Sequence, residues 1–233
     1  MITCINGHNA QQWKQSAWMD EASQVQSKRW DTQVSDRLVR ARIAFSGAHA
    51  GAWISSLPNR YCGKPFFSAS EWQTLLRWRL GMAFYETYTC ASCSQPADCL
   101  GDHALCCAAS GMYRRHNALR DLTGNLLRQA GISCALEVSL PGSTDRPADV
   151  LVPCGLGPRP LASDISIVHT FTSSQHHEEP SAGRAAADQE KAKVTKSKHA
   201  CDSAWWDFTP VVAETTGVWG KKLSISTTRY PEK

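Results

Sequence analysis

The segment RPADVLVPCGLGPRPLASDISIVH, residues 146–169, decides the fold class of the chain. It contains two short runs of mainly apolar and β-branched residues, 149–152 and 164–169, and the stretch between them is rich in proline and glycine. Such runs, bounded by turn residues, are typical of β-strands. Each run opens with an acid, Asp149 or Asp164, and adjacent strands of a small sheet could bring the two carboxylates side by side.

Helical and strand patterns flank this pair of strands. Residues 113–130 place four leucines at helical spacing, Gly131 stands where that helix would stop, and 132–140 has the β-branched pattern of a strand. After the pair, 184–200 has the composition of a helix and 208–214 that of a last strand. The predicted order is helix, strand, strand, strand, helix, strand, which is an α/β (α+β) fold without an internal repeat.

The N-terminal part, residues 1–85, is expected to be a helical segment. Apolar residues at roughly helical spacing predict an amphipathic helix over 30–45. Ser68 is an N-cap residue type and Glu71, three residues later, completes a capping box, so a second helix is predicted over 71–81. The aromatic residues of this second helix favour packing in the core over stacking on bases.

The composition is that of an ordinary folded protein. Of the 233 residues, 42% are hydrophobic and 20% charged, and the net charge of +4 is compatible with a nucleic-acid partner without requiring one. No run approaches the roughly 18 apolar residues of a membrane span, and residues 1–9 lack the basic and apolar start of a signal peptide. We therefore expect an intracellular, nuclear protein without a membrane partner. Its thiols would stay reduced there, so the ten cysteines need a reason other than disulfides.

Half of the cysteines fall within residues 90–107, together with a histidine. Two cysteines separated by two residues put two thiolates on one tight turn, and a histidine and a cysteine farther on complete a tetrahedral set. The predicted ligands are Cys90, Cys93, His103 and Cys107. We expect a CCHC zinc knuckle over 86–110 with structural Zn²⁺, because four protein ligands leave no open position for catalysis. Two alternatives stay open: Cys99 or Cys106 could substitute in the set, or the cysteines could simply be buried.

Three acids lie on or beside predicted strands, namely Glu137, Asp149 and Asp164. A metal-dependent nuclease needs carboxylates that converge on Mg²⁺, and a lysine near the attacking water. The alternative is that each acid caps a turn, because acids are common at the starts of strands.

Five motifs follow one another along the chain. They are Cys90-x2-Cys93, Gly101-Asp102-His103-Ala104-Leu105 with Cys107, Arg115-His116-Asn117-x2-Arg120-Asp121, Arg146-Pro147-Ala148-Asp149-Val150 and Asp164-Ile165-Ser166-Ile167-Val168. The series resembles the C-terminal region of site-specific non-LTR retrotransposon reverse transcriptase polyproteins. In that family a CCHC zinc knuckle is followed by a restriction-like endonuclease of the PD-(D/E)xK class. The resemblance covers about residues 40–220.

The resemblance implies a restriction-endonuclease-like α-β-β-β-α-β core with a mixed central sheet over 111–225. This agrees with the element order predicted from the patterns. One departure is Ala148, which separates the proline from the aspartate of the PD motif. The family's segments follow a reverse transcriptase, which these 233 residues do not contain, so we expect a truncated gene copy or a domesticated remnant.

The resemblance also implies roles for individual residues. Asp149 corresponds to the aspartate of the PD motif and Asp164 to the second acid that binds Mg²⁺, with Glu137 assisting from the first strand. Ser166 occupies the usual lysine position, and in this family the lysine is displaced onto the following helix. The lysines that match it best are Lys193 and Lys196.

Basic residues at the start of the first core helix could meet backbone phosphates, which would position DNA without reading its sequence. They are Arg114, Arg115, His116 and Arg120. The lysines within 184–200 form a basic face that is either solvated or in contact with phosphates.

These features predict a metal-dependent endonuclease that nicks a DNA strand, with catalytic Mg²⁺ and structural Zn²⁺. The alternative is a catalytically inactive, zinc-containing module that binds DNA or RNA. The sequence has no glycine-rich phosphate loop or dinucleotide fingerprint, so we expect no small-molecule cofactor.

Overall fold

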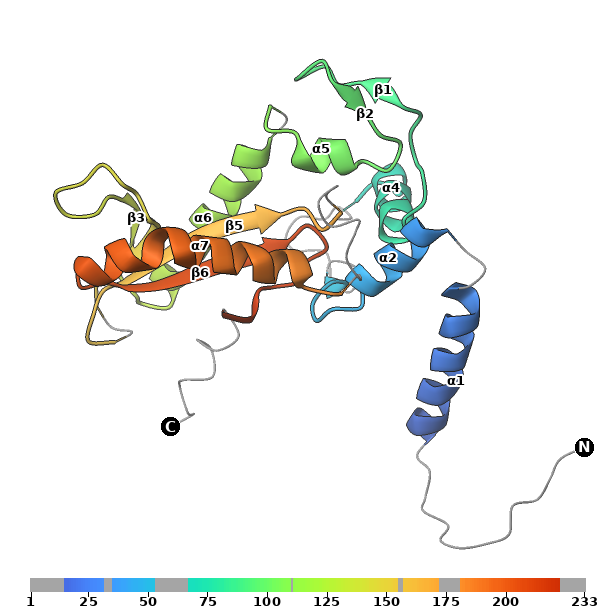
Figure 1. The fold of residues 1–233 in the computed structure, drawn as a ribbon, viewed down its shortest axis with the longest axis horizontal. Coiled ribbons are helices and arrows are strands. Elements are labelled where there is room, and N and C mark those ends of the chain that lie inside the picture. Colours follow the sequence, from blue (N-terminus) through green and yellow to red (C-terminus); the bar gives the residue numbers. More distant parts are fainter. Residues whose placement is uncertain are drawn as a thin grey trace, which may run out of the picture.

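The structure is a computed structural model. The residues that it describes are 15–31, 35–52, 67–109, 111–154, 157–171 and 181–222. No helix within these ranges is long and apolar enough to cross a membrane. The first helix, α1 (Gln15–Asp31), lies at the edge of the molecule, away from the strands (Figure 1).

A four-stranded mixed sheet forms the centre of the fold. Its strands are β3 (Ala135–Val138), β4 (Ala148–Val152), β5 (Leu161–Val168) and β6 (Asp207–Glu214), which lie side by side in that order. The pairs β3–β4 and β4–β5 are antiparallel, whereas β5 and β6 are parallel along their full lengths. A parallel neighbour needs a long crossover connection, which α7 (Arg184–Ser203) supplies. The prediction of a mixed sheet is therefore confirmed.

Two long helices cover the two faces of this sheet (Figure 1). On one face, leucines of α6 (Met112–Gln129) pack against Val150 and Ile165. On the other face, Cys201 of α7 packs in a cluster with Leu151. Successive residues of a strand point to opposite faces, so neighbours such as Val150 and Leu151 contribute to different layers. From α6 to β6 the element order is the one that the sequence predicts.

The helices α2 (Asp36–Ala44) and α4 (Ala69–Arg79) pack together at one end of the sheet. The rings of Phe45 and Trp78 meet edge to face, with 4.9 Å between their centroids. Their cluster includes Phe171, which follows β5, so these helices are attached to the sheet through a shared core.

Between α4 and α6 lies a small hairpin followed by a short helix. The elements are β1 (Tyr88–Thr89), β2 (Pro96–Ala97) and α5 (Asp102–Cys106). We call this part of the chain, residues 86–110, the knuckle segment. Its buried core contains a single alanine, Ala97, beside cysteines.

Several predicted bounds differ in the structure. The strand predicted over 132–140 is shorter, as β3, and the helix predicted over 184–200 is longer, as α7. The helix predicted over 30–45 is divided, because Trp30 belongs to α1 and α2 begins only after Ser35, an N-cap with extended backbone (φ −66°, ψ 150°). In addition, β5 starts at Leu161, which pairs with both β4 and β6. Asp164 therefore lies in the middle of its strand and not at its start.

A buried carboxylate caps α7 from the neighbouring strand. The N-cap residue of α7, Gly183, has no side chain to accept hydrogen bonds from the first backbone N–H groups. Glu214 ends β6, is 2% exposed, and accepts from the N–H of Ala186 at 3.2 Å. Its other carboxylate oxygen accepts from the hydroxyls of Thr170 and Thr216. A negative charge here also suits the helix dipole, so Glu214 fixes the start of α7 on the sheet.

We expect Glu214→Ala to lower the free energy of unfolding by about 2–3 kcal/mol, because it leaves buried donors without an acceptor. The control is Glu71→Ala, which removes the exposed capping box of α4 that the structure confirms at Ser68. That loss should be about 1 kcal/mol. Urea unfolding followed by circular dichroism measures both. Equal, small losses would contradict the capping role of Glu214.

Candidate active site and metal centre

The four predicted zinc ligands converge in the knuckle segment. We call them the Cys/His cluster: Cys90 after β1, Cys93 in the following turn, His103 in α5 and Cys107 just after α5. Their ligand atoms all lie within 4.8 Å of one another, and Cys93 Sγ lies 3.3 Å from His103 Nε2. Three thiols and an imidazole at this separation suit a tetrahedral ion with bonds of roughly 2.0–2.3 Å. The cluster could therefore hold a metal such as zinc. Among the described residues, Cys99 and Cys106 are not part of the group.

Local hydrogen bonds place these ligands. After β1, the N–H of Ser94 donates to the carbonyl of Cys90 at 2.8 Å, and Ser94 takes a left-handed conformation (φ 58°) that closes the turn. The half-buried carboxylate of Asp98 accepts from three backbone N–H groups at 2.6–3.0 Å, the last being that of His103. Burial raises the pKa of Asp98, but these donors outweigh burial and hold that pKa below its ordinary value. Asp98 thereby fixes the start of α5 and the position of His103.

The thiols of the cluster differ in their pKa. The N–H groups of Ser92 and Cys93 lower the pKa of Cys90. The N–H of Gln95 acts in the same direction on Cys93, but burial and the neighbouring thiols of Cys107 and Cys90 outweigh it and raise the pKa. Crowded sulfurs resist joint ionisation unless a cation shares their charge, which is what a bound metal ion provides.

Asp149 and Asp164 face each other across β4 and β5. The ladder pairs Val150 with Ser163, and one step further the same register brings Asp149 opposite Asp164. At this point the backbone N–H of Ile165 donates to Asp149 Oδ2 at 2.6 Å. The side chain of Asp149 therefore accepts a hydrogen bond where the backbone ladder between β4 and β5 ends. The ladder ends here, and the register places the two carboxylates on the same face of the sheet, close enough for the charge of Asp149 to raise the pKa of Asp164.

Two further side chains meet this pair. The ammonium of Lys193, on α7, contacts Asp164 Oδ1, and its side chain is only 13% exposed. Nε2 of His116, in the second turn of α6, lies 3.3 Å from Asp149 Oδ1. We call these four residues the carboxylate cluster. They form a row of histidine, carboxylate, carboxylate and lysine that reaches from one helix layer to the other.

The surroundings of Asp164 in the carboxylate cluster disfavour its negative charge, even though a lysine ammonium contacts it. Burial raises the pKa of Asp164, and the charge of Asp149 raises it further, although the ammonium of Lys193 opposes both. Two neighbouring carboxylates repel each other, and a divalent cation between them would relieve the repulsion. Oxygen donors of this kind suit a hard cation such as Mg²⁺.

Glu137 and Lys196, which the sequence groups with these acids, lie in different surroundings. Glu137, in β3, has a left-handed backbone (φ 52°), and its half-exposed carboxylate pairs with Arg120 and Arg146. Lys196 is exposed on α7. The structure therefore brings Lys193, and not Lys196 or Glu137, into contact with Asp164.

The residues predicted to meet phosphates are Arg114, Arg115, His116 and Arg120. Arg114 is exposed. Arg115 donates to the carbonyl of Leu105 in α5 at 2.6 Å, and Arg120 pairs with an acid of β3 and one of its own helix. These two guanidinium groups fasten α6 to its neighbours. His116 belongs to the carboxylate cluster.

A second polar group, which the sequence did not reveal, joins the knuckle segment to the sheet. Asp102, the first residue of α5, accepts from Arg37 at 2.8 Å and lies 3.1 Å from Nε2 of His169. The other ring nitrogen of His169 lies 2.9 Å from the hydroxyl of Thr215. Arg37 also stacks 3.7 Å above the ring of Phe171. The group ties α2 and α5 to the ends of β5 and β6.

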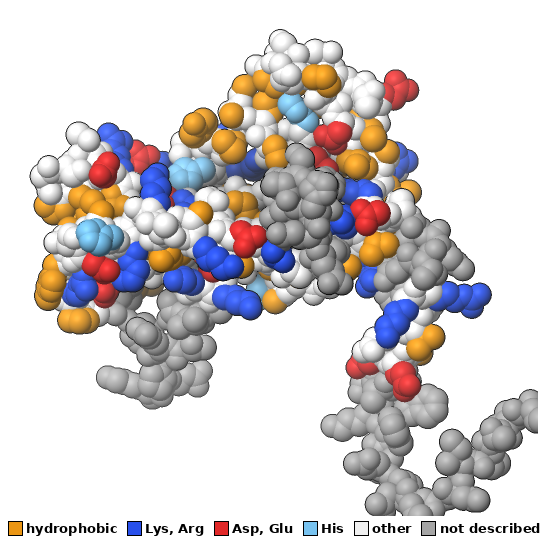
Figure 2. Space-filling model, in the orientation of Figure 1, with side chains coloured by type: hydrophobic (Ala, Val, Ile, Leu, Met, Phe, Trp, Pro, Cys, Tyr) orange, Lys and Arg blue, Asp and Glu red, His pale blue; other side chains and the backbone are white. Residues whose placement is uncertain are grey.

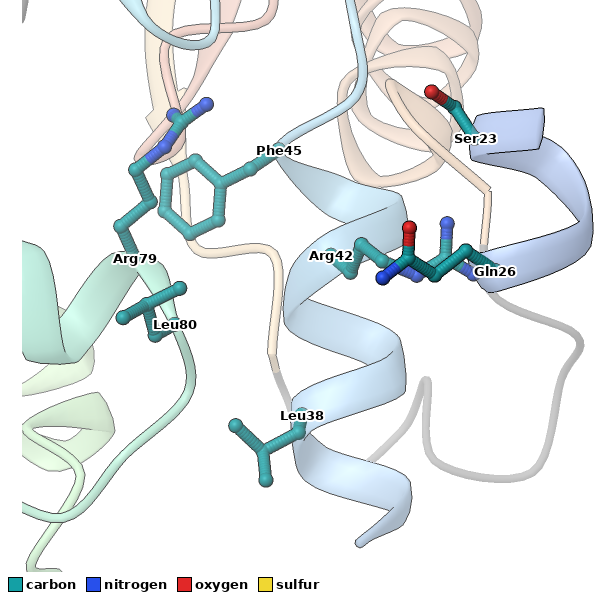
Figure 3. A pocket seen from close by; sticks show the side chains of 7 residues that line it. All are labelled: Ser23, Gln26, Leu38, Arg42, Phe45, Arg79 and Leu80. Carbon is teal, nitrogen blue, oxygen red and sulfur yellow. The ribbon is translucent and has the colours of Figure 1, made fainter. Parts of the chain in front are cut away.

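A pocket of about 450 Å³ lies among α1, α2 and α4 (Figure 3). The residues that line it are Ser23, Gln26, Leu38, Arg42, Phe45, Arg79 and Leu80. Arg79 lies over the ring of Phe45 and donates to the carbonyl of Ala50. The lining contains neither carboxylates nor thiols, and it shares no residue with the Cys/His cluster or the carboxylate cluster.

No family model matches the chain, and no curated protein matches it in sequence. Its function must therefore be inferred from the side chains that the fold brings together.

Proposed function

We propose that this protein is a metal-dependent endonuclease that nicks one strand of DNA, and that it is related to the C-terminal region of non-LTR retrotransposon polyproteins. The observation that carries the nuclease proposal is the position of Asp149 opposite Asp164 in the β4–β5 register, with the ammonium of Lys193 against Asp164. The order α-β-β-β-α-β from α6 to β6, around a mixed sheet, supports a restriction-like core of the PD-(D/E)xK class.

In this proposal Asp149 and Asp164 would hold Mg²⁺ through their carboxylate oxygens. When bound, Mg²⁺ polarises the phosphate and lowers the pKa of its water. Lys193, whose ammonium contacts Asp164, would orient the attacking water and stabilise the charge that develops on the phosphate oxygens. Its position is defined in advance, because α7 packs on the sheet and Asp164 holds the ammonium.

The Cys/His cluster has a structural role in the same proposal. Four protein ligands would satisfy Zn²⁺ and leave no open position for substrate. The ion would hold together the hairpin and α5, which lie beside the start of α6 through the contact of Arg115 with Leu105.

Exposed basic side chains follow α7 and offer contacts to the DNA backbone (Figure 2). Among the lysines of this helix, Lys196 is exposed, while Lys191 and Lys198 also pair with acids one turn away. Phosphates that lie along α7 would pass close to Lys193 and hence to the carboxylate cluster. Such contacts bind DNA without reading its sequence.

Plasmid nicking tests the proposal. Lys193→Met should slow the conversion of supercoiled to open-circular DNA in Mg²⁺ by about 10²–10³-fold, because it removes a charge that stabilises the transition state. Lys196→Met is the matched control on the same helix. It should keep the nicking rate at saturating DNA and weaken only the salt-sensitive DNA affinity.

Equal losses in the two lysine variants, or nicking that needs no divalent ion, would contradict the proposal. A wild-type protein that retards DNA in a gel but nicks none would favour the second candidate, a catalytically inactive, zinc-containing nucleic-acid-binding module.

A further inference from the structure

We infer that His116 is a positioning residue, which holds Asp149 in the orientation that binds the divalent cation. The inference rests on the proposed function and adds to it a residue for which the sequence suggested a phosphate contact. His116 lies at the end of the carboxylate cluster opposite Lys193.

Asp149 is held at both of its oxygens. The N–H of Ile165 donates to Oδ2 at 2.6 Å, and Nε2 of His116 lies 3.3 Å from Oδ1. One partner belongs to the backbone of the sheet and the other to a helix side chain, so the carboxylate cannot rotate without losing a contact. Each carboxylate oxygen can accept more than one bond, so both stay able to bind a cation.

The geometry indicates that His116 acts by orienting Asp149 and is not itself a ligand of the cation. Within the described part of the chain, the Cys/His cluster alone brings three or more potential ligand atoms within 4.8 Å of one another. The ring of His116 therefore does not converge with both Asp149 and Asp164 on one ion. Metal-binding carboxylates depend on contacts with neighbouring side chains of this kind for their orientation.

The position of His116 is itself fixed. Its neighbour Arg115 ties α6 to the carbonyl of Leu105, and Leu119, one turn later, packs in the core with Val150. The start of α6 is thus held from two sides. The imidazole stands against Asp149 before any cation binds, so that binding does not have to order it.

Titration calorimetry with Mn²⁺ on the zinc-loaded full chain tests this role apart from activity. His116→Ala should weaken Mn²⁺ binding by about 10–100-fold, the usual effect of losing a partner of a metal ligand. The Mg²⁺ concentration for half-maximal nicking should rise by a similar factor, while the rate at saturating Mg²⁺ stays within a few-fold of wild type. His116→Gln can still donate from its amide to Asp149, and it should recover most of the affinity. His199→Ala removes an exposed histidine of α7 and should behave as wild type.

The measurements distinguish a failure of the proposed function from a failure of the role of His116. A wild-type protein that binds no Mn²⁺ beyond its zinc site would refute the proposed function itself. If the wild type binds Mn²⁺ and His116→Ala binds it equally well, only the role of His116 is refuted. The same holds if His116→Gln is as weak as His116→Ala, or if His116→Ala loses its rate at saturating Mg²⁺ with unchanged Mn²⁺ affinity.

Discussion

Asp149→Asn is expected to abolish Mg²⁺-dependent nicking, with a loss of about 10³-fold, while the protein keeps its fold. The substitution preserves the shape of the side chain, and the asparagine oxygen can still accept from the N–H of Ile165. It removes the charge of one of the two acids proposed to hold the cation. The measurement is the rate at which supercoiled plasmid is nicked in Mg²⁺, compared with that of the wild type.

Thermal unfolding separates this loss of charge from a loss of fold. Burial is the main cause of the raised pKa of Asp164, and the charge of Asp149 adds to it. Because this pKa is raised in the folded state, ionised Asp164 costs stability near neutral pH, and the cost disappears as acid protonates the group. Asp149→Asn removes one contribution to that cost. Without added Mg²⁺, the Tm of the variant should therefore equal or exceed that of the wild type.

Added Mg²⁺ gives an independent readout of the site. An ion that binds only the folded protein adds about 1.4 kcal/mol of stability at ten times its Kd, so Mg²⁺ should raise the Tm of the wild type but not that of Asp149→Asn. Asp207→Asn is the matched control, because it changes an acid of β6 that lies 3.5 Å from Arg159. It should keep both the nicking and the Mg²⁺ shift. Nicking by Asp149→Asn near the wild-type rate would end the nuclease proposal.

The parts of the fold that the sequence predicts well have strong local signals. The capping box of Ser68 and Glu71 spans one turn, so it could be recognised without knowledge of the fold. The leucines of α6 and the β-branched runs of β4 and β6 place those elements within one residue of their observed bounds. The meeting of Asp149 and Asp164 follows from the pairing of two strands that are close in sequence.

The rest of the site depends on how α6 and α7 pack on the sheet, which the spacing of residues along the sequence does not reveal. Lys193 and Lys196 share a helix and are three residues apart, and only the packing of α7 on the sheet selects Lys193. Glu137 lies on the predicted strand, but its backbone is left-handed and its carboxylate pairs with arginines, not with the two aspartates. His116 meets Asp149 only because α6 crosses the sheet at that point.

Loss of one ligand of the proposed zinc ion is expected to unfold the knuckle segment. Cys107→Ser removes a buried thiol from the Cys/His cluster. The buried core of this segment consists of Ala97 and cysteines, so little apolar burial remains to hold the hairpin and α5 together without the ion. Structural zinc supplies roughly 10–16 kcal/mol of apparent binding energy in zinc-finger peptides. The zinc content of the purified variant should fall well below that of the wild type, with loss of helical signal that added Zn²⁺ does not restore.

The effect should extend to the carboxylate cluster, because α5 is fastened to the core at both of its ends. At its start, Asp102 contacts the buried ring of His169, just after β5. Near its end, the carbonyl of Leu105 accepts from Arg115, the neighbour of His116. An unfolded α5 would release both contacts and loosen the first turns of α6, and with them the partner that orients Asp149.

We therefore expect Cys107→Ser to raise the Mg²⁺ concentration for half-maximal nicking about tenfold, as His116→Ala does, while the sheet still unfolds cooperatively. Cys106→Ser changes the adjacent, exposed thiol and should keep both zinc and wild-type nicking. A Cys107→Ser protein that has lost its zinc but nicks at wild-type Mg²⁺ concentrations would show that the two metal sites are independent. In that case α5 would not support the start of α6, and the knuckle segment would contribute to the proposed activity only by holding nucleic acid.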